Sequence, residues 1–179
     1  LDSLRKVGPT SPIYLRARAM SLAVMGPADS AQRAYLDLGL QLRDPFYQGL
    51  MYTGLASLAQ TQGKLAEADR QMQANNGVLE RRGLPGDVLA GEAQRALRIA
   101  LFERDSVRAI AVLQSALERH PLNSMPALDR PYGVLATAYT IAGQPTQGKR
   151  LLGEYETAVP QGQRRGEPAW YRARGWLAR

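Results

Sequence analysis

A helical pattern that returns about every 39 residues is the feature that most constrains the fold of this chain. Apolar residues spaced three and four apart lie on both sides of short turns at 62–64, 103–105 and 142–144. This spacing puts the apolar side chains on one face of an α-helix. Two such stretches joined by a three-residue turn predict two antiparallel helices in a hairpin.

Two segments near opposite ends of the chain have similar sequences. PIYLRARAMSLA at 12–23 and PAWYRARGWLAR at 168–179 share an initial Pro, an aromatic third residue and Arg-Ala-Arg. Units counted from equivalent positions begin at about 12, 49, 90, 129 and 168. The segment at 168–179 is therefore predicted to be the first helix of a fifth unit. We expect a single repeat array over residues 1–179, with units near 12–45, 49–82, 90–123 and 129–162 and a partial unit at 168–179.

The positions of prolines and of polar residues near them agree with these repeat units. Pro121 and Pro160 are expected to end second helices, because proline cannot continue the backbone hydrogen bonding. Arg18 departs from the pattern, since it occupies a position where leucine is expected. Four expected helix starts have a polar residue before or near a proline, where its side chain can accept a hydrogen bond from the first turn; these residues are Ser11, Asp44, Asp129 and Glu167.

The composition narrows the class of protein. Apolar residues make up 45% of the 179 positions, which is enough for a packed core. No apolar run approaches the roughly 20 residues that cross a bilayer, so no membrane span is expected. Cysteine is absent, which is compatible with a reducing cytoplasm, where we expect the protein to be located. The net charge is +7, but residues 164–179 contribute +4 of it, which argues against a nucleic-acid platform over the whole chain.

A catalytic or metal centre is not expected. His120 is the single histidine, and its position before Pro121 is typical of a cation at the C-terminus of a helix. Without cysteine or a second histidine, a zinc site would need carboxylates as its other ligands, and no nucleophile motif supports Ser-His-Asp catalysis. No glycine-rich phosphate-binding motif occurs either. We therefore predict that this segment has no enzymatic activity and no cofactor.

The unit at 129–162 has the residue pattern of a known repeat family. It combines large and small apolar residues with a turn glycine and a closing proline, namely Tyr132, Leu135, Ala136, Tyr139, Gly143, Leu152 and Pro160. This pattern resembles the tetratricopeptide repeat, and the resemblance covers roughly residues 12–179. It implies an all-α fold, a right-handed α-solenoid of four antiparallel helix hairpins plus a final helix. Gly148, where the family usually has alanine, and spacings near 39 rather than 34 depart from the family pattern.

The resemblance also implies a binding surface, because the first helices of tetratricopeptide repeats line a concave groove. The residues of this sequence in the corresponding positions are Arg16, Met20, Thr53, Ser57, Gln94, Arg95, Arg98, Arg130, Thr137 and Arg172. This set contains no carboxylate, and planar guanidinium groups suit carboxylate ligands. We expect this predicted groove to bind a partner protein or an acidic peptide.

Three hypotheses for function follow. The first is a non-catalytic scaffold for protein–protein interaction. The second is a regulatory or sensory arm of a larger bacterial signalling protein, such as a serine/threonine kinase or a transcription regulator, because the chain starts at Leu1 without an initiator methionine and its stretched units are similar to those of such proteins. The third, less favoured, is RNA binding through the basic helix at 168–179, whose apolar face is also expected to promote self-association.

Overall fold

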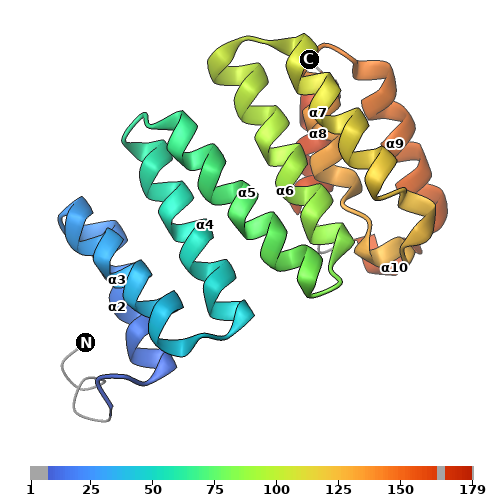
Figure 1. The fold of residues 1–179 in the computed structure, drawn as a ribbon. Coiled ribbons are helices and arrows are strands. Elements are labelled where there is room, and N and C mark those ends of the chain that lie inside the picture. Colours follow the sequence, from blue (N-terminus) through green and yellow to red (C-terminus); the bar gives the residue numbers. More distant parts are fainter. Residues whose placement is uncertain (1–7, 165–167, 179) are drawn as a thin grey trace. The chain divides into compact units, whose positions relative to one another are not determined.

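The computed structural model describes residues 8–164 and 168–178, and every regular element among them is a helix (Figure 1). This confirms the expected all-α class. The chain divides into two compact units, Leu1–Gly83 (unit 1) and Leu84–Arg179 (unit 2), and each is described separately. Within each unit, consecutive helices pack as antiparallel pairs, an arrangement that helical-repeat folds share. None of the described helices is long and apolar enough to cross a membrane.

From residue 8 onward, where the structure describes it, unit 1 has two helix pairs. Its helices are α2 (Pro12–Met25), α3 (Ala28–Leu42), α4 (Pro45–Thr61) and α5 (Leu65–Arg81). α3 packs against both α2 and α4, and α4 packs against α5. Small side chains at these contacts let the helices approach closely, and larger ones fill the space between them; the buried residues include Leu15, Ala34, Leu38, Ala56 and Ala68.

Two of the expected capping residues begin helices in unit 1. The Ser11 hydroxyl accepts a hydrogen bond from the backbone N–H of Tyr14 at 3.2 Å, at the start of α2. The Asp44 carboxylate accepts one from the N–H of Phe46 at 2.8 Å, at the start of α4. Each contact satisfies an N–H group that has no partner within its helix, so the polar residue before the proline determines where the helix begins.

An ion pair explains why Arg18 occupies a position where the repeat pattern calls for leucine. The Arg18 Nη1 atom donates to Asp37 Oδ2 on α3 at 3.0 Å, and both side chains are partly exposed. The arginine therefore joins α2 to α3 by charge where leucine would join them by apolar contact. Because the pair is near the surface, we expect it to contribute only about 0–1 kcal/mol to stability.

The described part of unit 2, residues 84–164 and 168–178, has two further helix pairs, followed by two more helices. The first pair is α6 (Pro85–Arg98), which continues as a π-helical turn, η1 (Ile99–Glu103), and α7 (Ser106–Arg119). Two 3₁₀ turns, η2 (Leu122–Ser124) and η3 (Ala127–Asp129), lead to the second pair, α8 (Tyr132–Ile141) and α9 (Pro145–Ala158). The short α10 (Gln161–Arg164) and then α11 (Pro168–Leu177) follow.

The helix α8 lies at the centre of unit 2. It packs against α6, α9 and α11, and its buried Tyr132 ring meets the Tyr155 ring of α9 edge-on, with centroids 5.8 Å apart. Gly148 of α9 lies so close to α8 that an added Cβ atom would be 2.8 Å from the Ala136 carbonyl oxygen and would also collide with the Thr140 hydroxyl. Close packing of the two helices therefore explains the glycine at 148, where tetratricopeptide repeats usually have alanine.

Three local features of unit 2 differ from the sequence expectation. α6 begins at Pro85, whereas the repeat pattern places the start of this unit near residue 90; proline fits the first turn because no helical partner is lost there. The same helix ends in a π-helical turn before Arg104, whose φ of 55° is left-handed. Asp129 does not cap α8, since no side chain accepts a hydrogen bond at the start of that helix. Glu167 lies outside the described residues.

Candidate functional site

Four residues of the predicted groove lie on helices of unit 2 that pack against one another. Gln94 and Arg98 lie one turn apart on α6, and Thr137 lies on α8, which packs against α6. Arg172 is exposed on α11, which also packs against α8. These residues therefore lie on three helices, of which α8 contacts the other two, and the groove that they were assigned to stays a prediction. The Thr137 hydroxyl itself donates to the Gly133 carbonyl within α8, at 2.8 Å.

Two arginines of the predicted groove make hydrogen bonds within unit 2. Arg95 Nη1 donates to Glu92 Oε2, one turn earlier on α6, at 3.4 Å, and Glu92 is buried with an exposed fraction of 6%. Arg130 Nε donates to the Met125 carbonyl at 2.9 Å, and its Nη1 donates to the Tyr132 hydroxyl at 3.0 Å. Both guanidinium groups are thus held by the fold, and the Glu92 carboxylate offsets the charge of Arg95.

The unit 1 residues of the predicted groove are all exposed. Arg16 and Met20 lie one turn apart on α2. Thr53 and Ser57 lie one turn apart on α4, on the side of the helix roughly opposite to the buried Leu55. Among these four, only Arg16 is a cation, so unit 1 adds little positive charge to the predicted groove.

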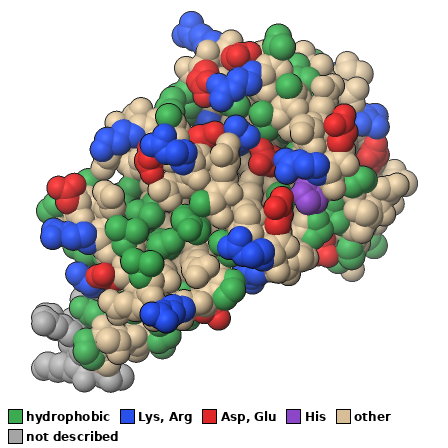
Figure 2. Space-filling model, in the orientation of Figure 1, with side chains coloured by type: hydrophobic (Ala, Val, Ile, Leu, Met, Phe, Trp, Pro, Cys, Tyr) green, Lys and Arg blue, Asp and Glu red, His purple; other side chains and the backbone are tan. Residues whose placement is uncertain are grey.

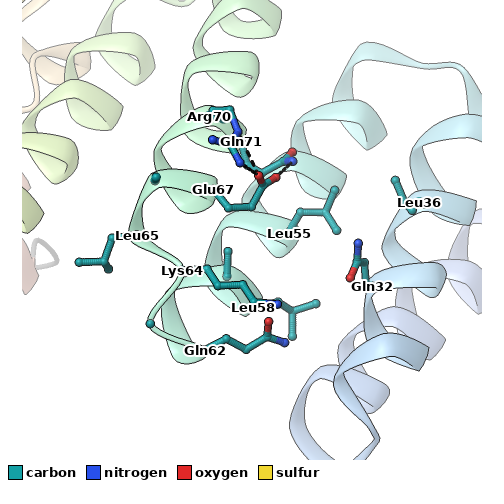
Figure 3. Close-up of a pocket in the computed structure, with 13 residues that line it drawn as sticks. Gln32, Leu36, Leu55, Leu58, Gln62, Lys64, Leu65, Glu67, Arg70 and Gln71 are labelled. Atoms are coloured by element: carbon teal, nitrogen blue, oxygen red, sulfur yellow. Dashed lines mark hydrogen bonds and ion pairs between the residues drawn. The ribbon is translucent and has the colours of Figure 1, made fainter.

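A cleft of about 790 Å³ lies in unit 1 between α3 and the α4–α5 hairpin (Figure 3). Its apolar lining is contributed by all three helices and consists of Leu36, Leu55, Leu58, Ala59, Leu65 and Ala66. Its polar side chains are Gln32, Gln62, Lys64, Glu67, Arg70 and Gln71. We call this hollow the unit 1 cleft. It combines an apolar surface with amide and charged groups, as sites that bind part of another protein do.

Helix packing produces the cleft. α4 contacts both α3 and α5, so it forms the floor while α3 and the start of α5 form the walls (Figure 3). The turn between α4 and α5 closes one end, where Gly63 has a left-handed φ of 72°. Leu40 is exposed one turn beyond Leu36 and extends the apolar surface along α3. Figure 2 shows hydrophobic side chains gathered on the face of unit 1 where α3 and α4 run in Figure 1.

Hydrogen bonds fix the charged wall of the cleft. The Glu67 carboxylate accepts a hydrogen bond from Gln71 Nε2 at 2.5 Å and further ones from the Arg70 guanidinium, including one from Nε at 3.0 Å. The Gln71 bond and the Arg70 contacts lower the pKa of Glu67 below its ordinary value of 4.5, and Lys64 acts in the same direction. Glu67 is thus ionised at neutral pH and already has two partners, whereas Lys64 extends from the turn beside it (Figure 3).

A second hollow lies on the α3 side of the cleft. Leu36 lines it together with Ser30 and Arg33 and the ion pair between Arg18 and Asp37. The described charged side chains that line the two hollows are four cations and two carboxylates. The surface around Leu36 and Leu40 is therefore apolar, and the charged side chains beside it have an excess of positive charge.

The described residues contain no cluster of the kind that holds a metal ion. No three His, Asp or Glu side chains among residues 8–164 and 168–178 come close enough together to hold a metal ion. His120 is the residue that follows α7 at its C-terminus. A comparison of the chain with models of protein families, with curated proteins and with solved structures gives no match. The resemblance to tetratricopeptide repeats therefore stays a prediction.

The unit 1 cleft contains none of the residues assigned to the predicted groove. That assignment follows the first helices of the units, whereas the walls of the cleft belong to second helices, α3 and α5. One feature of the sequence indicates that the helix at 28–42 has a second apolar face. Leu36 and Leu40 lie one turn apart on the helix at 28–42, away from the buried positions Ala34 and Leu38.

Proposed function

We propose that this chain is a non-catalytic protein-interaction module and that the unit 1 cleft holds an amphipathic helix of a partner protein. The observation that supports this most is the cleft itself: a helix floor between two helix walls, with leucines inside and amide and charged groups at its edge. A helix with apolar residues at positions i, i+3, i+4 and i+7 can place that face in such a groove. The partner's polar face then remains in water.

The charges around the cleft favour an acidic partner. Glu67 is held by Arg70 and Gln71, so its charge is offset within the cleft wall. Lys64 lines the cleft at the turn between α4 and α5, and Arg33 lines the neighbouring hollow on α3, one turn before Leu36. Carboxylates flanking the apolar face of a partner helix would meet these cations, and such pairs raise specificity and the association rate more than affinity.

Synthetic peptides test this proposal. We would measure the fluorescence anisotropy of a labelled peptide panel with leucines on one helical face and glutamates beside them, against matched peptides with lysine in place of glutamate. We expect the acidic peptides to bind and the basic ones to bind more weakly. Leu36→Gln should weaken binding by about tenfold or more, because one buried leucine contributes roughly 1.5–3 kcal/mol and about 1.4 kcal/mol is tenfold. Circular dichroism would verify that helix content is unchanged.

Two charge reversals locate the binding surface. Lys64→Glu lies in the cleft, whereas Arg16→Glu makes the same charge change on an exposed residue of the predicted groove. We expect Lys64→Glu to weaken binding of the acidic peptides and Arg16→Glu to leave it unchanged. The reverse result would move binding to the predicted groove. Absence of binding for the whole panel at about 1 mM peptide would contradict the cleft as a binding site.

The predicted groove of unit 2 is the second surface on which an acidic peptide could bind. Gln94, Arg98 and Thr137 lie on its two packed helices. Arg95 is unsuitable for a test by charge reversal, because a glutamate there would face the buried Glu92 carboxylate and destabilise the fold. Thr137→Lys is a cleaner probe, since it should strengthen binding of an acidic peptide to this surface and leave binding in unit 1 unchanged.

A further inference from the structure

The two ends of the unit 1 cleft differ in their side chains. α3 and α4 are antiparallel neighbours, so the start of α3 lies beside the end of α4 and the turn that closes the cleft. Gln32 of α3 and Gln62 and Lys64 of the turn are therefore at this closed end (Figure 3). Leu36 and Leu40 follow on α3, one and two helical turns beyond Gln32. The closed end thus carries polar side chains, and the leucines of α3 lead away from it.

The polar side chains of the closed end are available to a ligand. Among the described residues, none is hydrogen-bonded to the side chains of Gln32, Gln62 or Lys64. The Lys64 ammonium group offers three N–H donors and no acceptor, and each glutamine amide offers two donors and one acceptor oxygen. The carboxylate that lines the cleft, Glu67, already accepts hydrogen bonds from its neighbours on α5. The available groups at the closed end therefore include more donors than acceptors.

This excess of donors distinguishes the two ends of a bound helix. The last turn of an α-helix has carbonyl groups without partners and carries the negative end of the helix dipole, whereas the first turn has N–H groups without partners and carries the positive end. Carbonyl groups at the closed end would accept from the amides and from the Lys64 ammonium group. N–H groups there would face the same cation and would find acceptors only in the two amide oxygens. The closed end therefore favours the C-terminal end of a helix.

We infer that the partner helix lies in the unit 1 cleft with its C-terminal end at the α4–α5 turn, where Gln32, Gln62 and Lys64 donate to the carbonyl groups of its last turn. The helix then runs antiparallel to both walls, since α3 and α5 each start at the closed end. This inference rests on the proposed function and deepens it, because it specifies which end of the partner helix the closed end recognises. The partner is then a protein with an acidic amphipathic helix that ends where the cleft closes.

Lys64→Gln tests the inference through the affinities of two peptides, measured by fluorescence anisotropy. The peptides have the same composition and the same leucine face, but one has its glutamates in the last turn and the other in the first. Lys64→Gln should weaken the last-turn peptide about three- to fivefold and the first-turn peptide less than twofold, as expected for one ion pair near the surface. Comparing each peptide with itself removes differences in peptide helicity. Lys149→Gln makes the same change at an exposed residue of α9 and should affect neither. An equal or larger loss for the first-turn peptide would overturn the inference.

Spin labels on two single-cysteine variants read the direction itself, because the chain has no cysteine of its own. Thr61→Cys places a nitroxide at the end of α4, beside the turn, and Gln41→Cys places one in the last turn of α3, toward the opposite end; both residues are exposed. The ligand is an isotope-labelled acidic peptide of about 18 residues, which is about 27 Å long as a helix. We expect the label at 61 to broaden the NMR signals of the C-terminal residues of the peptide, and the label at 41 those of its N-terminal residues.

The outcomes of the spin-label experiment separate this inference from the proposed function. The opposite pattern, or equal broadening of both peptide ends by each label, would overturn the inference and leave binding in the cleft intact. If the peptide binds and neither label broadens any of its signals, the peptide lies elsewhere on the chain, and the proposed function fails together with the inference.

Discussion

Replacing Gly148 by alanine tests how closely α8 and α9 approach each other. α9 contains a second glycine, Gly153, which makes an internal comparison possible. A Cβ atom added at 148 would lie 2.8 Å from the Ala136 carbonyl oxygen and would collide with Thr140 Oγ1, whereas a Cβ added at 153 would meet no atom within 4 Å. The same substitution in one helix therefore enters a closed contact at one position and open space at the other.

The expected magnitudes follow from two opposing effects. Alanine is favoured over glycine inside a helix by about 1 kcal/mol, and both variants gain this. Overpacking a closed contact costs about 1–3 kcal/mol, and only Gly148→Ala has this cost. The carbonyl at Ala136 belongs to the α8 backbone, so it cannot move without shifting the helix. We expect Gly153→Ala to raise the free energy of unfolding by up to about 1 kcal/mol and Gly148→Ala to lower it by about 0–2 kcal/mol.

Urea denaturation followed by circular dichroism at 222 nm measures both variants. The difference between them isolates the packing cost, because the helix-propensity gain is common to both. Thr140→Ala combined with Gly148→Ala should recover part of that cost, since it removes the Thr140 hydroxyl and leaves the Ala136 carbonyl. Equal shifts for Gly148→Ala and Gly153→Ala would refute the close approach of α8 and α9 at this point.

Three further changes test other parts of the fold. Asp44→Ala should lower the free energy of unfolding by about 1 kcal/mol, measured by chemical denaturation, because the N–H of Phe46 loses its acceptor. Ala136→Leu should lower the melting temperature, since overpacking a fully buried position costs about 1–3 kcal/mol. The lowered pKa of Glu67, held down first by Gln71, gives stability that is present above pH 4.5 and is lost as the pH falls through that lowered pKa. Glu67→Gln should flatten this part of the stability curve in an acid titration, and an unchanged curve would contradict the assignment.

The helix hairpins could be predicted because their signals are local. The turn at 142–144 needs a residue with a positive φ, and Gly143 supplies it at 87°. Apolar residues spaced three and four apart then decide which face of each helix is buried. The contact at the start of α6 could not be predicted in this way, because it joins distant residues. Gly86 lies against the Asp129 carbonyl, where a Cβ atom would collide, and no local pattern marks that contact.

The candidate binding surfaces depend on which side chains contact one another, and the residue types alone do not show this. The Arg95–Glu92 pair has the spacing of helical neighbours, so its charge balance could have been recognised from the sequence. The Arg18–Asp37 pair joins two helices and could not.

The unit 1 cleft depends on the separation of α3 and α5 across α4, which is a property of helix packing. A pattern such as a row of arginines therefore identifies candidates for binding an acidic partner, but a cation already bound to a buried carboxylate contributes less to that binding. By this criterion Lys64, on the turn at the edge of the cleft, is a stronger candidate for contacting an acidic partner than Arg95, which is bound to Glu92.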